Sequence, residues 1–203
     1  MAGLPFFSRA YPSARGDRIT LQFPTGQEYS EWAELRSTSR QFLERWEPKW
    51  ASDELGRPAW RARIRRYREE YGRGTGTTFL IFLNDTGRIA GGISIGNIRR
   101  GVAQSAQIGY WMGERHAGRG IMAEALGLAN GYGFETLGLH RIEAACIPGN
   151  TRSMRVLEKA GFTREGLLRS YLKINGTWQD HYLYALIVDD YRAQQIRGKT
   201  GGT

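Results

Sequence analysis

One segment of the sequence constrains the fold more than any other, because in it a strand runs into a glycine-containing loop and a long apolar helix begins almost at once. The segment is AQIGYWMGERHAGRGIMAEALGLANGYGFETLG, starting at Ala106. Gly118 and Gly120 let the backbone approach an anion closely, and the unpaired amides of the first helical turn lie at the positive end of the helix dipole. Arg115 and Arg119 add positive charge. The segment therefore predicts an anion-binding loop between a strand and a helix.

Glycine pairs of this kind also close turns and permit tight packing of a helix on a strand, so the rest of the chain has to decide between these interpretations. Two common nucleotide-binding patterns are missing. No Gly-x-x-x-x-Gly-Lys-Ser/Thr loop exists, because Gly198-Lys199-Thr200 has Ala193 where the first glycine belongs and no predicted strand before it. The Gly-x-Gly-x-x-Gly pattern of dinucleotide-binding folds is missing as well.

Hydrophobic periodicity predicts a strand and two helices in the first third of the chain. The strand covers residues 19–23, and the second helix is a basic one that follows Pro58. The first helix follows Thr25 and carries one apolar stripe, formed by Trp32, Leu35, Phe42 and Trp46. Three further strand candidates follow, joined in part by the turn at residues 84–87. We expect these three strands to form an antiparallel meander that reaches to residue 112.

The second half of the chain alternates helix and strand before it ends in a hairpin. We expect a helix at 118–137, a strand at 141–147 and a helix at 150–160, followed by two strands joined at Asn175-Gly176. The fold class is therefore α/β, in the mixed α+β sense, with about seven strands. With 203 residues and no internal linker, one domain is expected, with its core at 19–191 and a flexible tail at 198–203.

Charge indicates an anionic partner. The 29 basic and 20 acidic residues give a net charge of +9, which attracts a nucleotide cofactor, RNA or an assembly built on RNA. The densest basic stretch is RPAWRARIRRYREEYGR, whose apolar residues recur at helical spacing: Trp60, Ile64, Tyr67 and Tyr71. Another side of the same helix holds Arg61, Arg65 and Arg68. This arginine-rich face is either a docking surface or a solvated face that keeps the protein soluble.

The compartment follows from what the chain lacks. No long apolar run predicts a membrane span, and the arginines near the start follow a short apolar patch, unlike those of a signal or transit peptide. Cys146 is a single cysteine without partners for a disulfide or a zinc site, and we expect it to be a small buried hydrophobe. None of the three histidines has metal-site spacing, so we expect no metal. The start of the chain and its single cysteine predict a cytoplasmic protein.

Two motifs together resemble the GNAT acetyltransferases. Arg115-x-x-Gly118-x-Gly120 matches the Arg/Gln-x-x-Gly-x-Gly/Ala motif with which that family binds the pyrophosphate of coenzyme A. HRIEAACIPGNTRSMRVLEKAGFTREG resembles the strand-helix-strand that follows in the family, with matches at Asn150, Ser153, Leu157, Glu158, Lys159, Gly161 and Phe162. The likeness extends over about residues 19–191 and is strongest to bacterial enzymes that acetylate the amino-terminal alanine or serine of ribosomal proteins. It implies a mostly antiparallel sheet, splayed between strands 4 and 5, flanked by helices.

The resemblance also implies the site and its cosubstrate, acetyl-coenzyme A. Main-chain groups near two residues of the splayed strand would hold the pantetheine arm, and one of them would donate to the thioester carbonyl as an oxyanion hole does. The residues implied for cosubstrate binding are Trp111, Met112, Arg115, Gly118, Arg119, Gly120, Ile121, Met122 and Asn150. His116 lies in the same loop and is a further candidate contact for the anion. Asn150 has the alternative role of a helix N-cap, and Tyr110 and Trp111 could pack in the core instead.

Two residues are candidates for the chemistry. An α-amino group with a pKa of about 7.7 to 8.0 is already partly neutral at neutral pH, so a strong base is optional. Glu143 is the candidate base, because glutamates on or near this strand serve in some relatives, and it could equally be the structural partner of an arginine. The family often protonates the leaving thiolate with a tyrosine at the position of Leu157. Its absence turns attention to Ser153, a hydrogen-bond donor for the thiolate or an ordinary first-turn residue.

Three functions are compatible with this sequence. The leading one is an amino-terminal acetyltransferase for a ribosomal protein, with ribosome or RNA contact through the basic surface. The second is an acetyltransferase for a small amine or antibiotic, which a closed and acidic acceptor cleft would favour. The third is a non-catalytic module that binds an acyl-coenzyme A and associates with RNA or the ribosome.

Overall fold

The computed structural model describes residues 11–200, with side chains described up to residue 197. The first ten residues, on which the expectation about a leader peptide rests, lie outside the described range, and so do residues 201–203 of the expected tail. Residues 198–200 are the last residues of a helix that begins at Val188.

A single eight-stranded sheet forms the centre of the described molecule, in the order β1-β2-β3-β4-β5-β6-β8-β7. Its strands are β1 (Ser13–Arg15), β2 (Ile19–Gln22), β3 (Thr77–Leu83), β4 (Ile89–Arg99), β5 (Ser105–Met112), β6 (Arg141–Cys146), β7 (Thr163–Ile174) and β8 (Thr177–Ile187). All neighbours pair antiparallel except β5 and β6. The expected meander is therefore present as β3, β4 and β5.

The parallel pair β5–β6 is short. Only three residue pairs join the two strands, from Ser105↔Arg141 to Gln107↔Glu143. Beyond Gln107, β5 continues for five residues to Met112 while it remains paired with β4 on its other side. The sheet is thus open between β5 and β6. These are strands 4 and 5 of the sequence-based expectation, which did not include β1, so the splay expected from the resemblance is confirmed.

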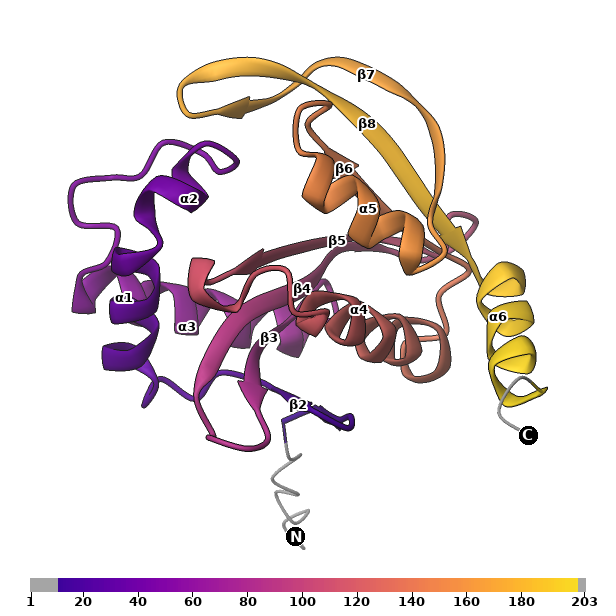
Figure 1. The fold of residues 1–203 in the computed structure, drawn as a ribbon, viewed down its shortest axis with the longest axis horizontal. Coiled ribbons are helices and arrows are strands. Elements are labelled where there is room, and N and C mark those ends of the chain that lie inside the picture. Colours follow the sequence, from indigo (N-terminus) through magenta and orange to yellow (C-terminus); the bar gives the residue numbers. More distant parts are fainter. Residues whose placement is uncertain (1–10, 201–203) are drawn as a thin grey trace, which may run out of the picture.

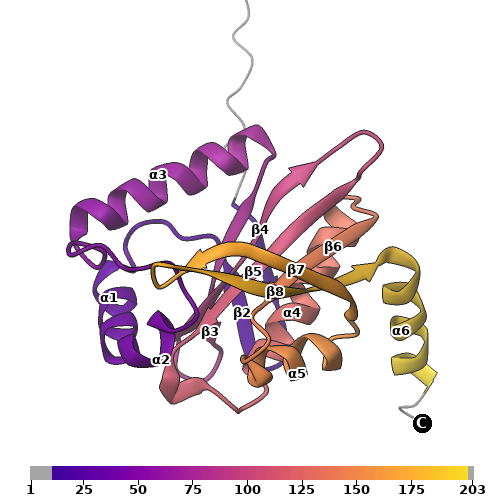
Figure 2. The ribbon, with the colours of Figure 1, turned by 90° about the horizontal axis from the view of Figure 1, so that it is seen from above.

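Helices cover both faces of this sheet (Figures 1 and 2). They are α1 (Tyr29–Thr38), α2 (Arg40–Glu44), α3 (Arg57–Arg73), α4 (Ile121–Gly131), α5 (Thr151–Lys159) and α6 (Val188–Thr200). The buried side chains fall into two clusters. One joins the sheet to α4 and α5 and contains Phe79, Ile142 and Leu126, and the other joins it to α1 and α3 through Trp32 and Trp60.

Three features differ from the sequence-based expectation. The single helix expected to carry Trp32 through Trp46 is two helices, because the chain breaks at Ser39. Ser39 is 1% exposed, and its hydroxyl accepts a hydrogen bond from the Glu114 main chain at 2.9 Å, which ties this break to the predicted anion loop. Strand β1 and helix α6 are additional elements at the ends of the described chain.

The long β7–β8 hairpin arches over the sheet toward α2 (Figure 1). It turns at Asn175 and Gly176, both at positive φ, as the sequence predicted for that pair. At this tip the Asn175 main-chain N–H donates to the carbonyl of Glu47 at 2.9 Å. The hairpin thus bridges the space above the splayed part of the sheet.

None of the helices within residues 11–200 combines the length and the apolar character required to cross a membrane.

Close packing of β4 against β5 gives the first testable prediction. A Cβ at Gly91 would overlap the carbonyl oxygen of Trp111 on β5, whereas a Cβ at Gly96 on the same strand would meet nothing within 4 Å. We expect Gly91→Ala to lower the free energy of unfolding by about 1 to 3 kcal/mol through overpacking. Gly96→Ala should change it by less than about 0.5 kcal/mol. Urea denaturation of both variants tests this. Equal effects would show that the close approach of β4 to the Trp111 carbonyl does not require a glycine at position 91.

Candidate active site

The anion loop predicted from the sequence lies directly after the free end of β5. A 3-10 turn at Glu114–His116 leads into Gly118 and Gly120, which adopt φ of 78° and 76°, and α4 begins at Ile121. This left-handed conformation favours glycine. A Cβ at Gly118 would meet nothing within 4 Å, so the space above it is open to a ligand.

The loop presents a row of unpaired main-chain N–H groups. Within the described residues, the amides of residues 118–123 donate to no protein acceptor, while the neighbouring amide of Ala117 bonds to Glu114 and that of Glu124 to Gly120. Gly118, Arg119 and Gly120 are exposed. Free amides at the N-terminus of an 11-residue helix form a binding site for phosphate groups. These groups fit the pyrophosphate that the resemblance implies.

Arg18 holds this loop from the other side, a contact that the sequence analysis missed. Its guanidinium donates to the carbonyls of Arg119 at 3.0 Å and Gly120 at 3.2 Å, and to Glu124 at 2.8 Å. Its main-chain N–H also donates to Glu124 at 2.9 Å. Arg18 thus fixes the carbonyl side of this turn, while its amides are unpaired because they precede or begin the first turn of α4.

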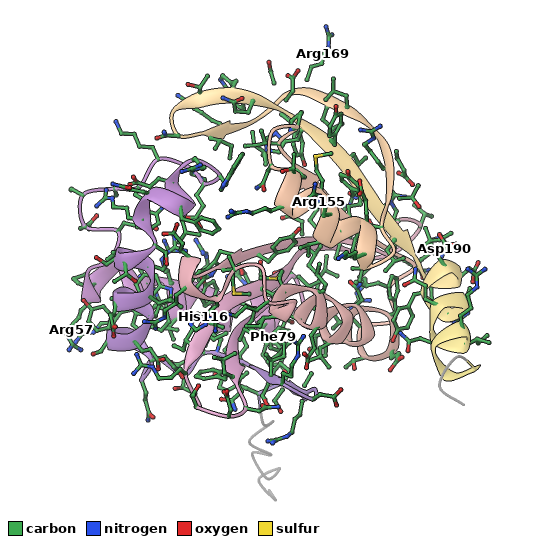
Figure 3. The ribbon with its side chains drawn as sticks, viewed as in Figure 1. Arg57, Phe79, His116, Arg155, Arg169 and Asp190 are labelled. Atoms are coloured by element: carbon green, nitrogen blue, oxygen red, sulfur yellow. The ribbon has the colours of Figure 1, made fainter. Side chains whose placement is uncertain are left out.

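Positive charge around the loop comes from two arginines with different surroundings. Arg119 is exposed, whereas Arg115 lies 3.8 Å from Glu34 and donates to the Nε2 of His116 at 3.1 Å. His116 is 8% exposed and lies inward of the loop (Figure 3). Burial lowers its pKa, and the nearby Arg115 and Arg119 lower it further. His116 is thus buried beside the loop and in contact with Arg115, and its role as an anion contact stays a prediction.

The free end of β5 directs alternate side chains to opposite faces, as expected for a strand. Trp111 packs in the α1–α3 cluster, with the guanidinium of Arg36 4.9 Å from its ring centre. Met112 is buried in the α4–α5 cluster, and Tyr110 packs against it. The side chains of Trp111 and Met112 thus pack in the two clusters. Along the unpaired edge of β5, the main-chain groups of these residues remain available to a ligand.

The first turn of α5 faces Tyr110. Asn150 is the N-cap, and its Oδ1 accepts from the Ser153 main chain at 3.1 Å. The Ser153 hydroxyl lies 2.7 Å from the hydroxyl of Tyr110. Burial raises the pKa of Tyr110, and the hydrogen bond with Ser153 offsets only part of this effect. Leu157, at the position where the family often has a tyrosine, is buried. The raised pKa keeps the Tyr110 phenol protonated beside Ser153, a contact that the sequence analysis did not predict.

Cys146 lies beside the same turn. It is 3% exposed, and burial raises the pKa of its thiol, although a hydrogen bond with Ser153 partly opposes the shift. This confirms that Cys146 is a small buried residue.

Glu143 lies at the last residue pair that joins β5 and β6, and its carboxylate is paired with two arginines. Arg141 donates to its carboxylate at 2.9 Å, and Arg99 lies 3.4 Å away. Arg141 also pairs with Glu165 at 2.5 Å. This geometry is that of the second interpretation of Glu143, a structural partner of arginines, and its role as a base stays a prediction.

A hollow of about 880 Å³ lies on the opposite face of the sheet from α4. Its floor is formed by β4 and by Gly109, Tyr110 and Trp111 of β5, and the inner side of α3 forms a wall. Both signs of charge line it: Glu47, Glu70, Arg66 and Arg99. The open loop and this hollow therefore meet at the same stretch of β5.

A chain of polar side chains crosses the base of the hollow. Asn97 donates to Gln107 at 2.7 Å, and Gln107 donates to the hydroxyl of Tyr171 on the β7–β8 hairpin at 3.1 Å. Asn97 has a positive φ of 50° at a bulge of β4. Sequence patterns gave no signal for this contact, because it joins residues 64 positions apart. The buried His181 stacks edge-on to Tyr171, and Asp180 beside it is exposed.

Comparison with known families and proteins agrees with this geometry. A family described as an acetyltransferase (GNAT) domain matches residues 18–163. The chain is 43% identical over 156 residues to a probable N-acetyltransferase, YjcK, of Bacillus subtilis, with 77% of this chain and 86% of that protein covered. It is 33% identical over 175 residues to the ribosomal protein uS5-alanine N-acetyltransferase of Escherichia coli, with coverage of 86% and 90%.

Solved structures show the same fold. The ribosomal-protein-S5-alanine acetyltransferase of Vibrio fischeri superposes with a TM-score of 0.82 at 30% identity, covering 89% of this chain and 98% of the other. RimJ of Mycobacterium smegmatis, solved in complex with CoA-disulfide, also gives a TM-score of 0.82, at 32% identity and with 89% of each chain covered.

The glycine loop gives a prediction about ligand affinity. Gly118→Asp or Gly120→Asp places charge and bulk beside the free amides, so we expect coenzyme A to bind at least tenfold more weakly in titration calorimetry. Gly101→Asp is the matched control, since Gly101 also has a positive φ of 66° and open space around it but lies at the other end of β5. An unchanged affinity in the loop variants, or an equal loss in the control, would contradict the assignment.

The Arg18–Glu124 contact gives a prediction about pH. Burial acts to raise the pKa of Glu124, but hydrogen bonds from the main chain and side chain of Arg18 outweigh it and lower the pKa. A lowered pKa means that the stabilisation is complete above the unfolded-state value of about 4.3 and is lost as the pH falls through the folded-state pKa. We expect Glu124→Gln to cost about 1 kcal/mol at pH 7.

Urea denaturation between pH 7 and pH 3 measures this cost, which should shrink below about pH 4.3. Glu44→Gln is the control, because Glu44 pairs only with Arg40 within α2. A cost for Glu124→Gln that stays constant over this range would show that the carboxylate charge does not matter.

Proposed function

The chain belongs to the GNAT acetyltransferase family and uses acetyl-coenzyme A as its acyl donor, and we propose that it acetylates the amino-terminal alanine or serine of a ribosomal protein in the cytoplasm. When bound, the donor supplies an acetyl thioester that is open to attack by an amine. The relatives named as uS5- and S5-alanine acetyltransferases support the acceptor class.

One observation carries the proposal: the unpaired edge of β5 touches both the loop and the hollow. Its residues 109–111 line the hollow, and Met112 leads within a few residues into the free amides of 118–123. A donor held at the loop and an acceptor held in the hollow can therefore meet at the opening between β5 and β6. Bringing the two reactants together in this way supplies much of the rate enhancement in such transfers.

The donor is held, in this proposal, by main chain more than by side chains. The residues we assign to it are Trp111, Met112, Arg115, Gly118, Arg119, Gly120, Ile121, Met122 and Asn150. The amides at 118–123 bind the pyrophosphate, with Arg119 and Arg115 adding charge. A main-chain N–H near Trp111 or Met112 stabilises the negative charge that develops on the carbonyl oxygen. The side-chain Nδ2 of Asn150 is available for the pantetheine arm, because its Oδ1 serves the helix cap.

Departure of the thiolate is assisted by the hydroxyl pair. Ser153 donates a hydrogen bond to the sulfur, and Tyr110, 2.7 Å away, fixes the orientation of that hydroxyl. Glu143 remains our candidate base, although the two arginines at its carboxylate favour a role in fixing the end of β6. An α-amino group needs only a weak base, or water, to lose its proton near neutral pH.

The shape and charge of the hollow favour a protein terminus over a small amine. A binding site for a small cation would be closed and acidic, whereas this hollow is open, and arginines as well as glutamates line it. An extended peptide can lie beneath the β7–β8 hairpin with its amino group at the opening. We therefore do not favour an antibiotic or polyamine as the acceptor.

The acceptor proposal is tested by a substrate panel. Acetyl transfer from acetyl-coenzyme A is measured on peptides that begin with alanine, serine or methionine, and on polyamines and aminoglycosides. We expect kcat/KM to be at least tenfold higher for alanine or serine peptides than for any small amine. Turnover confined to small amines would overturn the acceptor assignment, and coenzyme A binding without any turnover would favour a non-catalytic module.

The hydroxyl pair is tested by kinetics. We expect Ser153→Ala to lower kcat by about tenfold to a hundredfold, the value of one hydrogen bond to a charged group. The affinity for coenzyme A should change by less than threefold, and Ser153→Thr should restore part of kcat. Tyr110→Phe should lower kcat less than Ser153→Ala. An unchanged kcat in Ser153→Ala would show that Ser153 does not assist departure of the thiolate and is only a residue of the first turn of α5.

A further inference from the structure

A second groove lies on the outer side of α3, away from the hollow that the proposed reaction uses. Its volume is about 590 Å³, and the chain at Thr25 and Gly26 forms its other wall. Trp60 donates to the Gly26 carbonyl at 3.0 Å, and Arg68 donates to the Thr25 carbonyl at 2.7 Å. The groove is therefore part of the packed structure of α3 and this segment.

One face of α3 carries a row of arginines beside this groove, which we call the basic stripe: Arg57, Arg61, Arg65 and Arg68. Their spacings of four, four and three residues place them on the same side of the helix, over about 16 Å at 1.5 Å per residue. Three of the four line the groove. At the outer end, Arg57 lies over the ring of Tyr29 at 4.4 Å and is directed away from the molecule (Figure 3).

The stripe keeps its charge, whereas two other arginines of α3 are neutralised. Arg63 pairs with Glu54 and Arg66 with Glu70, both off the stripe. Within the part of the chain that the structure describes, neither Arg61 nor Arg65 contacts a carboxylate. Glu69 is the one acidic residue among those that line the groove. A local excess of cations remains, in a chain whose net charge is +9.

The stripe offers charge without an apolar anchor. The apolar side chains beneath it, Trp60 and Ile64, are 3% and 5% exposed, so they are already used by the core. In residues 11–197 the exposed large hydrophobic side chains all lie off α3: Tyr11, Val102, Leu167, Leu172, Trp178 and Ile196. A protein interface needs a buried apolar centre, and an interfacial helix needs apolar side chains to insert into lipid. A phosphodiester backbone needs neither, because its binding is electrostatic.

We propose that the basic stripe and its groove bind the sugar-phosphate backbone of a folded RNA. The contact is made by guanidinium groups with phosphates, so it selects for the backbone and not for base sequence. Arginine suits this role because its planar, permanently charged group hydrogen-bonds phosphate at two points.

The position of the stripe links it to the acceptor, and this link alone rests on the proposed function. Helix α3 lines the hollow with Arg66, Tyr67 and Glu70, and the groove with Arg61, Arg65 and Arg68. RNA on the stripe therefore lies across one helix from the hollow. An acceptor protein already bound to RNA would present its amino terminus there, so the enzyme would favour assembled or assembling particles over the free peptide.

Binding of a fluorescein-labelled RNA hairpin, measured by anisotropy at several salt concentrations, tests the proposal without any acetyl transfer. The variant Arg61→Gln/Arg65→Gln removes two charges that pair with no carboxylate among the side chains of residues 11–197. The control Arg155→Gln/Lys159→Gln removes two charges from exposed residues at the same i, i+4 spacing on α5. We expect the stripe variant to bind at least tenfold more weakly near 100 mM salt, with the slope of log K against log salt reduced by about 1.5. The control should stay within threefold of the wild type.

The outcomes separate the alternatives. An equal loss in the two variants, or no loss in the stripe variant, would overturn the assignment of the stripe, as would a wild-type protein that does not bind the hairpin. Stripe-dependent binding to vesicles of phosphatidylcholine and phosphatidylserine that is as tight as RNA binding would replace RNA by a membrane surface. Acetylation of a free alanine peptide should be unchanged in the stripe variant, so a failed acceptor assignment would be seen in that assay and not in RNA binding.

Ultraviolet cross-linking of the wild-type protein to the hairpin locates the contact without substitutions. Peptides from within Arg57–Arg73 should carry the cross-linked nucleotides. Cross-links confined to α5 or to the β7–β8 hairpin would contradict the proposal.

Discussion

The separation of β5 from β6 after three residue pairs is the constraint on which the rest of this structure depends. A strand edge that leaves its partner exposes main-chain groups that must find another acceptor or donor. Here the unpaired edge runs from Ile108 to Met112. The opposite edge of the same strand is hydrogen-bonded to β4, which holds β5 in place. A ligand that completes this edge would be held by main-chain groups of β5.

Two sites of opposite character share this edge. On the α4 side, Arg18 holds the carbonyls of the glycine turn, and the unpaired amides at the start of α4 form an anion site. On the α3 side, the hollow is large, open and of mixed charge, as suits an extended peptide. Membership of the GNAT family accounts for the first site. Family membership does not account for the hollow or for the basic stripe on the outer face of α3. We expect these two features to determine which acceptor this chain acetylates.

Local sequence signals predicted most of the elements and the conformation of the glycine loop. The glycines at 118 and 120, the strand before them and the apolar helix after them are neighbours in sequence, so a pattern could reveal them. The break at Ser39 could not be seen, because the apolar stripe continues across it and only the tertiary contact with Glu114 gives it a purpose. Arg18 and Tyr110 were missed for the same reason, since their partners lie about a hundred and about forty residues away. For Glu143 the sequence left two interpretations open, a base or the partner of an arginine, and only the structure gives the distances to Arg141 and Arg99.

Hydrogen exchange of the main-chain amides tests the central claim most directly. The amides of residues 118–123 have no protein acceptor, so they should exchange rapidly in the free enzyme and become protected when coenzyme A is added. The turn at residues 100–103, at the other end of β5, should not change. Amides at 118–123 that are already protected without coenzyme A, or that exchange equally fast with it, would contradict the account.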